Sequence, residues 1–462
     1  MSILDRVIQT LPEVSRPAQK QLPFKEKLKW TSITLVLFFV LGLVPLFGLG
    51  ANELQRFEFL SIILGASFGS IISLGIGPLV TGSIVLQLLN GSGILHFDLT
   101  KPEGKAKFQG IQKLMGIFFV LFEAGIYVLM GGLAPEPALA GTTTYMYLQA
   151  VLIFQLILGG ILIMFMDEVV SKWGFGSGIS LFIAAGVAQE VFIRAFSPLH
   201  SVQNPEAYVG ALPELFRSLA AGDATTAGIM LASLVATVTV FFVAVYAESM
   251  KIEIPLSFGR VRGHGIRWPL QFIYTSNIPV ILVAALQANI QLWARLLQNW
   301  GYPLLGTFAG NTPATGLVAW LYAPDVMRKI ITGSLALQDI GAALAYILFM
   351  TIGSIVFAWF WVQTSGMDAG SQAKQIMAAG LQIPGFRKDE RILERVLERY
   401  ITPLTIMGAL AVGLIASFAD LSGALSRGTG ILLAVMIVYK LYEEIAKQHM
   451  MDMNPMLRKF VE

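Results

Sequence analysis

The chain of 462 residues contains no cysteine, only four histidines and few charged residues. Without cysteine it has neither a disulfide framework nor a thiolate metal site. The histidines fall in expected loops or tails, without the spacing of metal ligands. The phosphate-binding pattern Gly-x-x-x-x-Gly-Lys-Ser/Thr is also absent, which excludes nucleotide hydrolysis by that route. We therefore expect neither an enzyme nor a cofactor.

The scarcity of charge indicates a membrane protein. Charged residues make up 13% of the chain and hydrophobic residues 55%, and the mean hydropathy is +0.69. Such values are typical of polytopic membrane proteins. Residues 1–29 lack the features of a cleavable signal peptide, so the first apolar run, about 30–49, is expected to stay as a permanent helix.

Long apolar runs predict ten membrane crossings and an all-α fold. An even number of crossings places both termini on one side of the membrane. With that side in the cytosol, 25 of the 32 Lys and Arg residues are cytosolic, as the positive-inside rule requires for a cell membrane. The expected crossings are about 30–49, 70–95, 114–133, 145–166, 178–196, 225–247, 270–293, 340–363, 401–419 and 426–445.

One apolar run is interrupted. No charged residue occurs between Glu58 and Asp98, and Gly75-Ile76-Gly77-Pro78 breaks the run in its middle. We interpret it as a short half-inserted piece, about Phe57–Ser67, followed by one crossing, about Ser70–Leu95. Non-helical backbone at membrane depth occurs only where protein or an aqueous cavity surrounds it. The break therefore favours a channel or a transporter over an inert anchor.

Two long cytosolic loops carry basic residues. Residues 248–269 alternate apolar and polar side chains around a Gly-rich tip, which predicts a hairpin. Residues 364–399 contain a helix with Glu/Arg pairs after the tip at 385–388. The charges have two interpretations, a solvated face or a docking site for a polyanion such as ribosomal RNA. Residues 2–22 have apolar side chains at helical spacing, which predicts an amphipathic segment that packs against a partner helix or, as the favoured interpretation, lies on the membrane surface.

Glu123 lies in the middle of the third expected crossing. A buried carboxylate needs partners, and Thr81, Asn277 and Asn289 lie at a comparable depth. A secondary transporter of a small solute or ion would use such a group as a relay, and this remains the alternative function. Because a single acid makes a poor relay, a polar clasp between helices is the favoured role.

Branched and aromatic side chains flank the helix breakers. Ile76 and Val80 are four residues apart, Phe175 and Ile179 repeat that spacing, and Ile278 and Ile281 lie on either side of Pro279. Core packing is the simple interpretation of this pattern. A hydrophobic constriction that blocks ions is the alternative.

Short motifs along the chain resemble those of the SecY family, the pore-forming alpha subunit of the protein-conducting channel, and most closely its archaeal members. The likeness extends over nearly the whole sequence. The motifs are Leu11-Pro12-Glu13-Val14, the run from Phe24 to Trp30, the run from Ser73 to Pro78, Asp167-Glu168, the run from Ser171 to Gly178, Ser276-Asn277-Ile278-Pro279 and Gly428-Thr429-Gly430.

The resemblance implies ten transmembrane helices in two pseudo-symmetric halves of five around a central hourglass pore. It divides the chain into a cytosolic N-terminal segment (1–29), a first half (30–200), a second half (201–447) and a cytosolic tail (448–462). It also implies a pore ring made of Ile76, Val80, Phe175, Ile179, Ile281 and Ile415, with Ile278 beside it.

Further roles follow from the same resemblance. Thr81, Glu123 and Asn289 match a polar cluster at a lateral gate. The half-inserted piece matches a plug, with Phe57, Phe59, Leu60, Ile62, Ile63 and Leu64. Arg260, Arg262, Arg387 and Lys388 lie on loops that resemble ribosome contacts. The implied function is passage of unfolded polypeptides across the membrane and lateral release of hydrophobic segments into it. The implied partners are the ribosome, the nascent chain with its signal sequence, membrane lipid and two small single-span subunits (SecE or gamma, and beta), but not DNA.

Overall fold

The structure is a computed structural model of the chain. It describes residues 10–18, 22–52, 69–91, 94–95, 97, 102–200, 206–258, 265–275, 278–309, 312–378, 381–382, 389–426 and 428–453. The predicted plug and the four basic residues assigned to ribosome contacts lie outside these residues, as does Asn277.

A helix occupies each of the ten ranges in which an apolar run predicts a crossing. These helices are α2 (Phe24–Gly42), α4 (Gly77–Gly91), α5 (Pro102–Leu129), α6 (Thr143–Trp173), α7 (Gly178–Phe196), α9 (Ala224–Ser249), α10 (Ile278–Asn299), α13 (Leu337–Thr364), α15 (Glu390–Leu421) and α16 (Gly428–Met453). Within the described residues, seven helices are long and apolar enough to cross a membrane. The first turns of α2 and the second half of α16 are charged, which shortens their apolar parts, and α4 is itself short.

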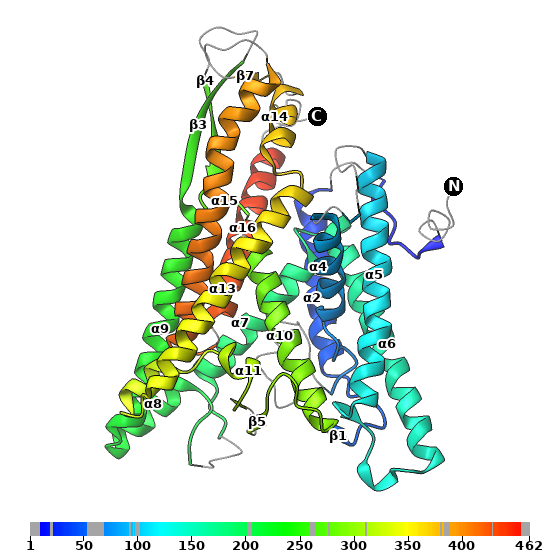
Figure 1. Cartoon of the computed structure of the whole chain (residues 1–462), viewed down its shortest axis with the longest axis vertical. Coiled ribbons are helices and arrows are strands. Elements are labelled where there is room, and N and C mark those ends of the chain that lie inside the picture. Colours follow the sequence, from blue (N-terminus) through cyan, green and yellow to red (C-terminus); the bar gives the residue numbers. More distant parts are fainter. Residues whose placement is uncertain are drawn as a thin grey trace.

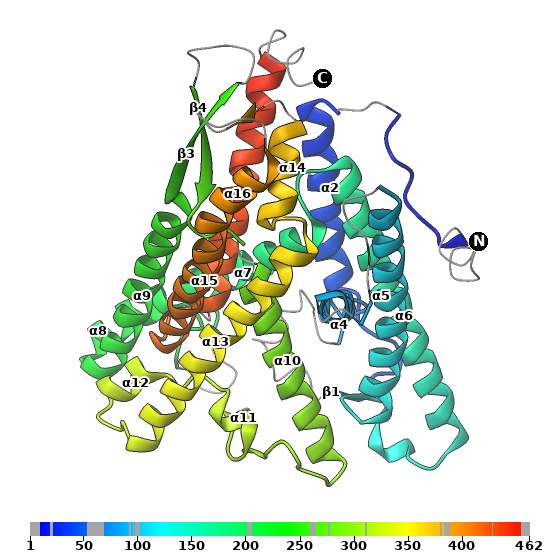
Figure 2. The ribbon, with the colours of Figure 1, turned by 45° about the horizontal axis from the view of Figure 1, so that its top comes forward.

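The helices form two groups. In Figure 1 the N-terminal helices α2, α4, α5 and α6 stand on one side and the C-terminal helices α9, α13, α15 and α16 on the other, with α10 between them. Figure 2 shows α10 again beside α4 and α13. In α10, 72% of the most apolar window is buried, against 17% in α9, so α10 is a central helix and α9 a peripheral one.

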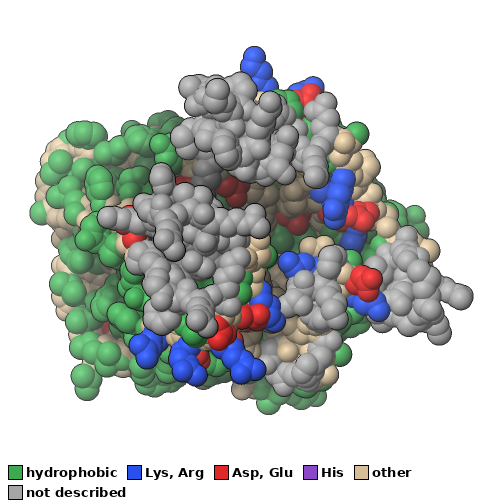
Figure 3. Space-filling view, turned by 90° about the horizontal axis from the view of Figure 1, so that it is seen from above, with side chains coloured by type: hydrophobic (Ala, Val, Ile, Leu, Met, Phe, Trp, Pro, Cys, Tyr) green, Lys and Arg blue, Asp and Glu red, His purple; other side chains and the backbone are tan. Residues whose placement is uncertain are grey.

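Apolar side chains also cover the outside of the bundle. Leu344, Leu348 and Ile352 repeat at intervals of four along α13 and are each more than half exposed. In water such a stripe would be unfavourable, but lipid is its natural environment. Figure 3, seen from above, shows apolar side chains along the flank and Lys, Arg, Asp and Glu gathered on the end of the molecule.

Glycines allow the helices of the first half to approach closely. A Cβ built on Gly82 of α4 would lie 3.0 Å from the backbone nitrogen of Gly116 in α5. One built on Gly160 of α6 would lie 2.7 Å from a methyl group of Val120 in α5. Small residues at such crossings bring backbones together where lipid provides no hydrophobic drive.

The hairpin predicted in residues 248–269 is confirmed. Strands β3 (Lys251–Phe258) and β4 (Gly265–Gln271) pair antiparallel, and β7 (Leu381–Gln382) pairs with the far end of β3. The helix expected after residues 385–388 is α15, and the side chain of Asp389 accepts a hydrogen bond from the backbone nitrogen of Arg391 at its start.

The remaining elements are short. They are the helices α8 (Ala211–Ala221), α11 (Leu317–Trp320), α12 (Val326–Ile331) and α14 (Ala369–Ala378), the 3-10 turn η2 (Pro137–Leu139), and the strand pairs β1 (Ala51–Asn52) with β2 (Leu133–Ala134) and β5 (Phe308–Ala309) with β6 (Thr312–Pro313). Most of them connect the long helices at the end opposite to the sheet (Figure 1).

Candidate functional site

The break at Gly75–Pro78 is a buried turn rather than the first part of a crossing. We predict helix from about residue 70, but residues 71–76 form turns and α4 begins only at Gly77. Gly75 has a φ of 57°, which favours glycine, and Pro78 fits the first turn of the helix. Ile72, Leu74 and Ile76 in this turn are almost fully buried, so protein surrounds the non-helical backbone.

This turn is held against α6. A Cβ built on Gly159 would lie 1.7 Å from the carbonyl oxygen of Ile71, so only glycine permits this approach. Ser73 adds local support, because its hydroxyl oxygen accepts a hydrogen bond from the backbone nitrogen of Gly69 at 2.9 Å. The position of Ile76 therefore depends on a contact with a helix far away in the sequence.

Six of the seven residues assigned to the pore ring lie in or against one hydrophobic core cluster. Ile76, Val80 and Ile281 are buried members of that cluster. Ile179, Ile278 and Ile415 are partly buried and pack against it. The six side chains come from the turn before α4 and from α4, α7, α10 and α15. The cluster extends further through the bundle, so it includes more residues than a ring requires.

The start of α7 places Ile179. Asp167 of α6 accepts a hydrogen bond from the backbone nitrogen of Ile179 at 2.9 Å. A Cβ built on Gly178 would lie 2.6 Å from the Cα of Asp167, so glycine is needed for this contact. The two motifs Asp167-Glu168 and Gly174–Gly178 thus form one junction between α6 and α7.

Phe175 lies apart from the other six. It is buried, but it is not a member of their cluster. Its ring packs on that of Phe24 at 5.5 Å between centroids, and its backbone nitrogen donates to the hydroxyl of Thr31 at 3.1 Å. Gly176 has a φ of 67°, and the chain turns there before α7 begins. Phe175 consequently contacts the first turns of α2.

Thr81, Glu123 and Asn289 come together between α4, α5 and α10. The side-chain amide of Asn289 donates to the hydroxyl of Thr81 at 3.1 Å. Thr81 also interacts with the buried carboxyl of Glu123. Within the part of the chain that the structure describes, Oε2 of Glu123 has no hydrogen-bond partner. Helices α10 and α13 both contact α4, so this cluster joins the two groups of helices.

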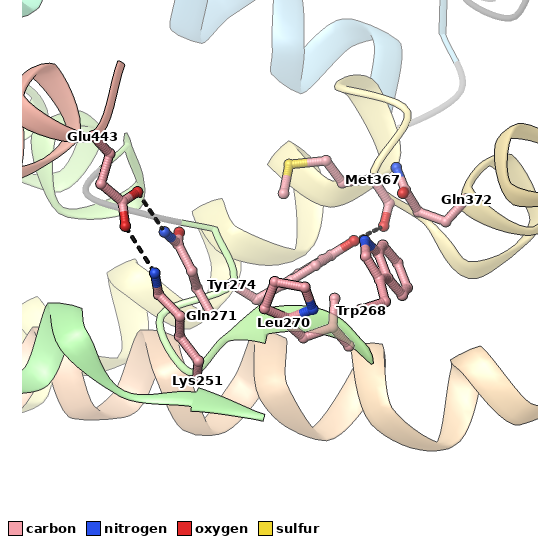
Figure 4. Close-up of a pocket in the computed structure, with 9 residues that line it drawn as sticks. Lys251, Trp268, Leu270, Gln271, Tyr274, Met367, Gln372 and Glu443 are labelled. Carbon is pink, nitrogen blue, oxygen red and sulfur yellow. Dashed lines mark hydrogen bonds and ion pairs between the residues drawn. The ribbon is translucent and has the colours of Figure 1, made fainter. Parts of the chain in front are cut away.

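A groove of about 370 Å³ opens at the base of the β3–β4 hairpin (Figure 4). Lys251 and Glu443 form an ion pair of 2.8 Å at one end, which raises the pKa of Lys251. At the other end the hydroxyl of Tyr274 donates to the carbonyl oxygen of Met367 at 2.6 Å. Trp268 lies beside the contact between Tyr274 and Met367 and gives this end of the groove an aromatic wall.

A buried polar cluster in the second half has no signal in the sequence. Asp420 of α15 accepts hydrogen bonds from the hydroxyls of Tyr346 and Thr429 and from the backbone nitrogen of Thr429. The three residues come from α15, α13 and α16. Because the partners lie far apart in the chain, only the folded structure identifies them.

Comparisons with known proteins agree with this architecture. The SecY family model matches residues 70–442. The protein translocase subunit SecY of Methanothermobacter thermautotrophicus is 46% identical over 98% of this chain and 96% of its own length. That of Pyrococcus furiosus is 43% identical over 97% and 96%.

Several solved structures are similar to the structure of this chain. A structure described as a protein conducting channel has a TM-score of 0.83 and 40% identity, covering 97% of this chain and 98% of its own. Sec61 in a canine ribosome-channel complex has a TM-score of 0.79 and 40% identity over the same shares. A family model that matches most of the chain and relatives of more than 40% identity over nearly its full length lead to one conclusion: this chain belongs to the SecY family.

Proposed function

We propose that the protein is a channel that conducts unfolded polypeptides across the cell membrane and releases hydrophobic segments sideways into lipid. The observation that carries this proposal is the convergence of six aliphatic side chains, from five separate elements, on one buried core. A narrow apolar neck accommodates water and ions poorly, so it would seal around an extended chain. The names of the relatives, translocase subunit and protein conducting channel, support the same function.

The proposed architecture has ten crossings in two halves around an hourglass pore, with the sheet end in the cytosol. Helices at all ten expected ranges support the number of crossings. The amide of Gln448 in α16 donates to the carbonyl oxygen of Leu22 at 2.6 Å, so both described ends of the chain lie on one side. The excess of Lys and Arg on that side supports its cytosolic location.

In this proposal Phe175 lies next to the pore ring rather than in it. Its contacts with Phe24 and with Lys27, whose Nζ lies 5.6 Å from the ring centroid, support a position beside the first turns of α2, which would be the cytosolic end of that helix. The ring would then consist of Ile76, Val80, Ile179, Ile281 and Ile415, with Ile278 beside them.

The lateral gate would open between α4 and α5 on one side and α10 and α13 on the other. The hydrogen bond from Asn289 to Thr81 crosses this boundary and would break when the gate opens. Each segment of the moving chain could then partition into lipid. On insertion scales Leu or Ile favours lipid by about 0.3–0.6 kcal/mol, whereas Asp, Lys or Arg costs about 2.5–3.5 kcal/mol. The choice of each segment between lipid and the pore would thus follow its free energy of transfer and would need no catalytic residue in the channel.

Partners are proposed on the same basis. A canine relative is described in a complex with the ribosome, which supports ribosome docking through the basic tips that carry Arg260, Arg262, Arg387 and Lys388. The plug, about 57–67, would close the outer funnel, and a relative's structure is described in terms of a plug domain that stabilises the closed state. Two small single-span subunits and lipid would cover the exposed apolar flanks.

Crosslinking of a stalled translocation intermediate tests the pore. The chain has no cysteine, so single cysteines at Ile76 and at Ile281 can be introduced without a background reaction. We expect both positions to crosslink to a thiol-reactive probe in the stalled polypeptide. The matched control is a cysteine at Leu348 of α13, which is 58% exposed on the apolar flank and should not react. Labelling at Leu348 but not at Ile76 and Ile281 would contradict the proposal.

A further inference from the structure

The segment of residues 10–18, here the N-terminal strap, lies against the C-terminal end of α6 and the middle of α5. Residues 12–17 are neither helix nor strand. They cross four side chains, here named the polar cleft: Lys113 of α5 and Glu168, Lys172 and Trp173 of α6. Glu168 forms ion pairs with both lysines, and all three side chains are mostly buried, with 14–16% exposed. Ion pairs therefore link the charged side chains of the cleft to one another.

The cleft binds the main chain of the strap. Its four side chains make one hydrogen bond each: Lys113 Nζ to the carbonyl oxygen of Pro12 (2.5 Å), Glu168 Oε2 from the backbone nitrogen of Val14 (2.8 Å), Lys172 Nζ to the carbonyl oxygen of Val14 (2.7 Å) and Trp173 Nε1 to the carbonyl oxygen of Ser15 (2.9 Å). Donors and acceptors thus match the main chain of a segment without regular secondary structure, as in other sites that recognise peptides by their main chain.

One side chain of the strap adds a charged contact. Glu13 forms an ion pair of 2.5 Å with Lys172, and its carboxyl is 59% exposed. This hydrogen bond, with the nearby charges of Lys172, Lys113 and Arg16, lowers the pKa of Glu13, so the carboxylate is ionised at neutral pH. The site accordingly suits an extended peptide with one acidic residue, and exposure makes the charged contact sensitive to salt.

The strap binds to a helix that also contributes to the proposed gate. Lys113 lies on α5, the helix that also carries Glu123, whereas Lys172 lies on α6. The two lysines hold the carbonyl oxygens of Pro12 and Val14, two residues apart and thus within about 7 Å along the backbone. When α5 moves away from α6 at the level of Lys113 by more than the reach of a lysine side chain, one of these bonds must break.

The residues that follow the strap in the chain contact the second group of helices. Leu22 accepts the hydrogen bond from Gln448 of α16, and the rings of Phe24 and His449 lie 5.9 Å apart. The N-terminal segment therefore contacts α5 and α6 through residues 12–15 and α16 through residues 22–24. A single stretch of chain joins both groups of helices at this end.

We propose that the cleft on α5 and α6 is a peptide site that holds the strap as a latch, and that release of the strap lowers the barrier to movement of α5 at the gate. The peptide site stands on its own contacts, whereas the latch role rests on the proposed gate. The resident ligand is the chain's own segment Pro12–Ser15, bound by its main chain and by Glu13.

Thiol accessibility in the full-length protein tests the peptide site. A single cysteine at Val14 keeps the main-chain contacts, and its modification by a charged thiol reagent measures release of the strap. We expect Glu13→Lys to speed modification about fivefold, as loss of one exposed ion pair predicts. High salt should speed the parent but not Glu13→Lys. The matched control is Glu103→Lys, the same charge change on an exposed residue of α5, which should leave the rate unchanged. Equal rates of cysteine modification in Glu13→Lys and in the parent would show that the cleft does not hold the strap through Glu13 and would contradict the proposed peptide site.

A second readout tests the latch. Cysteines at Thr81 and Asn289 are joined by a short bifunctional thiol reagent, and the rate of crosslinking reports the closed gate. Glu13→Lys should slow this crosslinking at least twofold relative to Glu103→Lys and should improve translocation of a substrate with a weakened signal sequence. If Val14→Cys becomes accessible while gate crosslinking stays unchanged, the latch role is wrong. If the parent itself forms no gate crosslink, the proposed gate fails and the peptide site is judged by the first readout alone.

Discussion

At the scale of single residues, three buried carboxylates differ in the number of donors that reach them. Asp420 accepts three hydrogen bonds and Glu214 also accepts three, from Arg217 twice and from the backbone of Tyr208. Glu123 interacts with Thr81, and among the described residues its Oε2 has no hydrogen-bond partner. A buried carboxylate whose hydrogen bonds are all made stabilises the fold. One that lacks a partner and lies where two groups of helices meet is suited to a contact that breaks when the helices move.

Glu214 provides a prediction about pH. It is buried at the start of α8, and its hydrogen bonds with Arg217 lower its pKa. A lowered pKa means that the contribution to stability is present at neutral pH and is lost as the pH falls from about 5 through the folded-state pKa. Glu214→Gln should therefore destabilise the protein by about 1–2 kcal/mol at pH 7. Thermal unfolding in detergent should show this difference shrinking toward pH 3, whereas the exposed control Glu136→Gln should show none at either pH.

Glu123 distinguishes a clasp from a relay. Glu123→Gln keeps the shape of the side chain and the contact with Thr81 but removes the ionisable group. We expect it to shift the threshold of gate opening, with translocation kept within about tenfold, because one weakened polar contact changes an equilibrium by about 1 kcal/mol. Translocation assays on proteoliposomes measure this. Complete loss of activity in a stably folded variant would instead favour a proton or ion relay.

At the scale of elements, hydrophobic runs predict where helices occur better than where they begin and end. The predicted crossing at 30–49 corresponds to α2, which ends at Gly42, because Pro45 disfavours helix in the residues before it. Helix α5 begins at Pro102 rather than near 114, since its charged first turns extend beyond the apolar run. Hydropathy detects the segment that lipid can hold, whereas capping and turn residues set the ends. The short helices α8 and α14 and the strand β7 carry no such signal.

The contact of Gly159 with Ile71 leads to a prediction about the turn that precedes α4. Its close approach to Ile71 fixes the turn that precedes α4, so Gly159→Ala should push residues 70–76 away from α6 and displace Ile76. Overpacking of this kind costs about 1–3 kcal/mol, and we expect a lower unfolding temperature together with greater ion leak. Gly125→Ala on α5 is the control, because a Cβ there meets nothing within 4 Å. If both variants unfold and leak alike, the turn is not held by this contact.

At the scale of the whole molecule, the sequence indicates residue types, while the fold decides which of them meet. Thr81 and Asn289 are 208 positions apart and become hydrogen-bonded only because α4 and α10 cross between the two groups of helices. Their comparable depth and the family resemblance both indicate that they lie close together, whereas periodicity alone does not. Phe175 illustrates the limit, because its spacing from Ile179 matches that of Ile76 and Val80 but its contacts lie with α2.

The hydrogen bond between Asn289 and Thr81 leads to a prediction for the whole channel. Joining cysteines at Thr81 and Asn289 with a short bifunctional thiol reagent would fasten α4 of the first half to α10 of the second. If the halves must part for lateral release, membrane integration of a hydrophobic segment should fall at least tenfold, a barrier increase of about 1.4 kcal/mol or more. Cleavage of a reducible linker should restore integration. The matched control is one cysteine alone, at Thr81 or at Asn289, treated with the same reagent, which should keep most activity. Undiminished integration by the fully crosslinked protein would mean that hydrophobic segments leave by a route other than the boundary between α4 and α10.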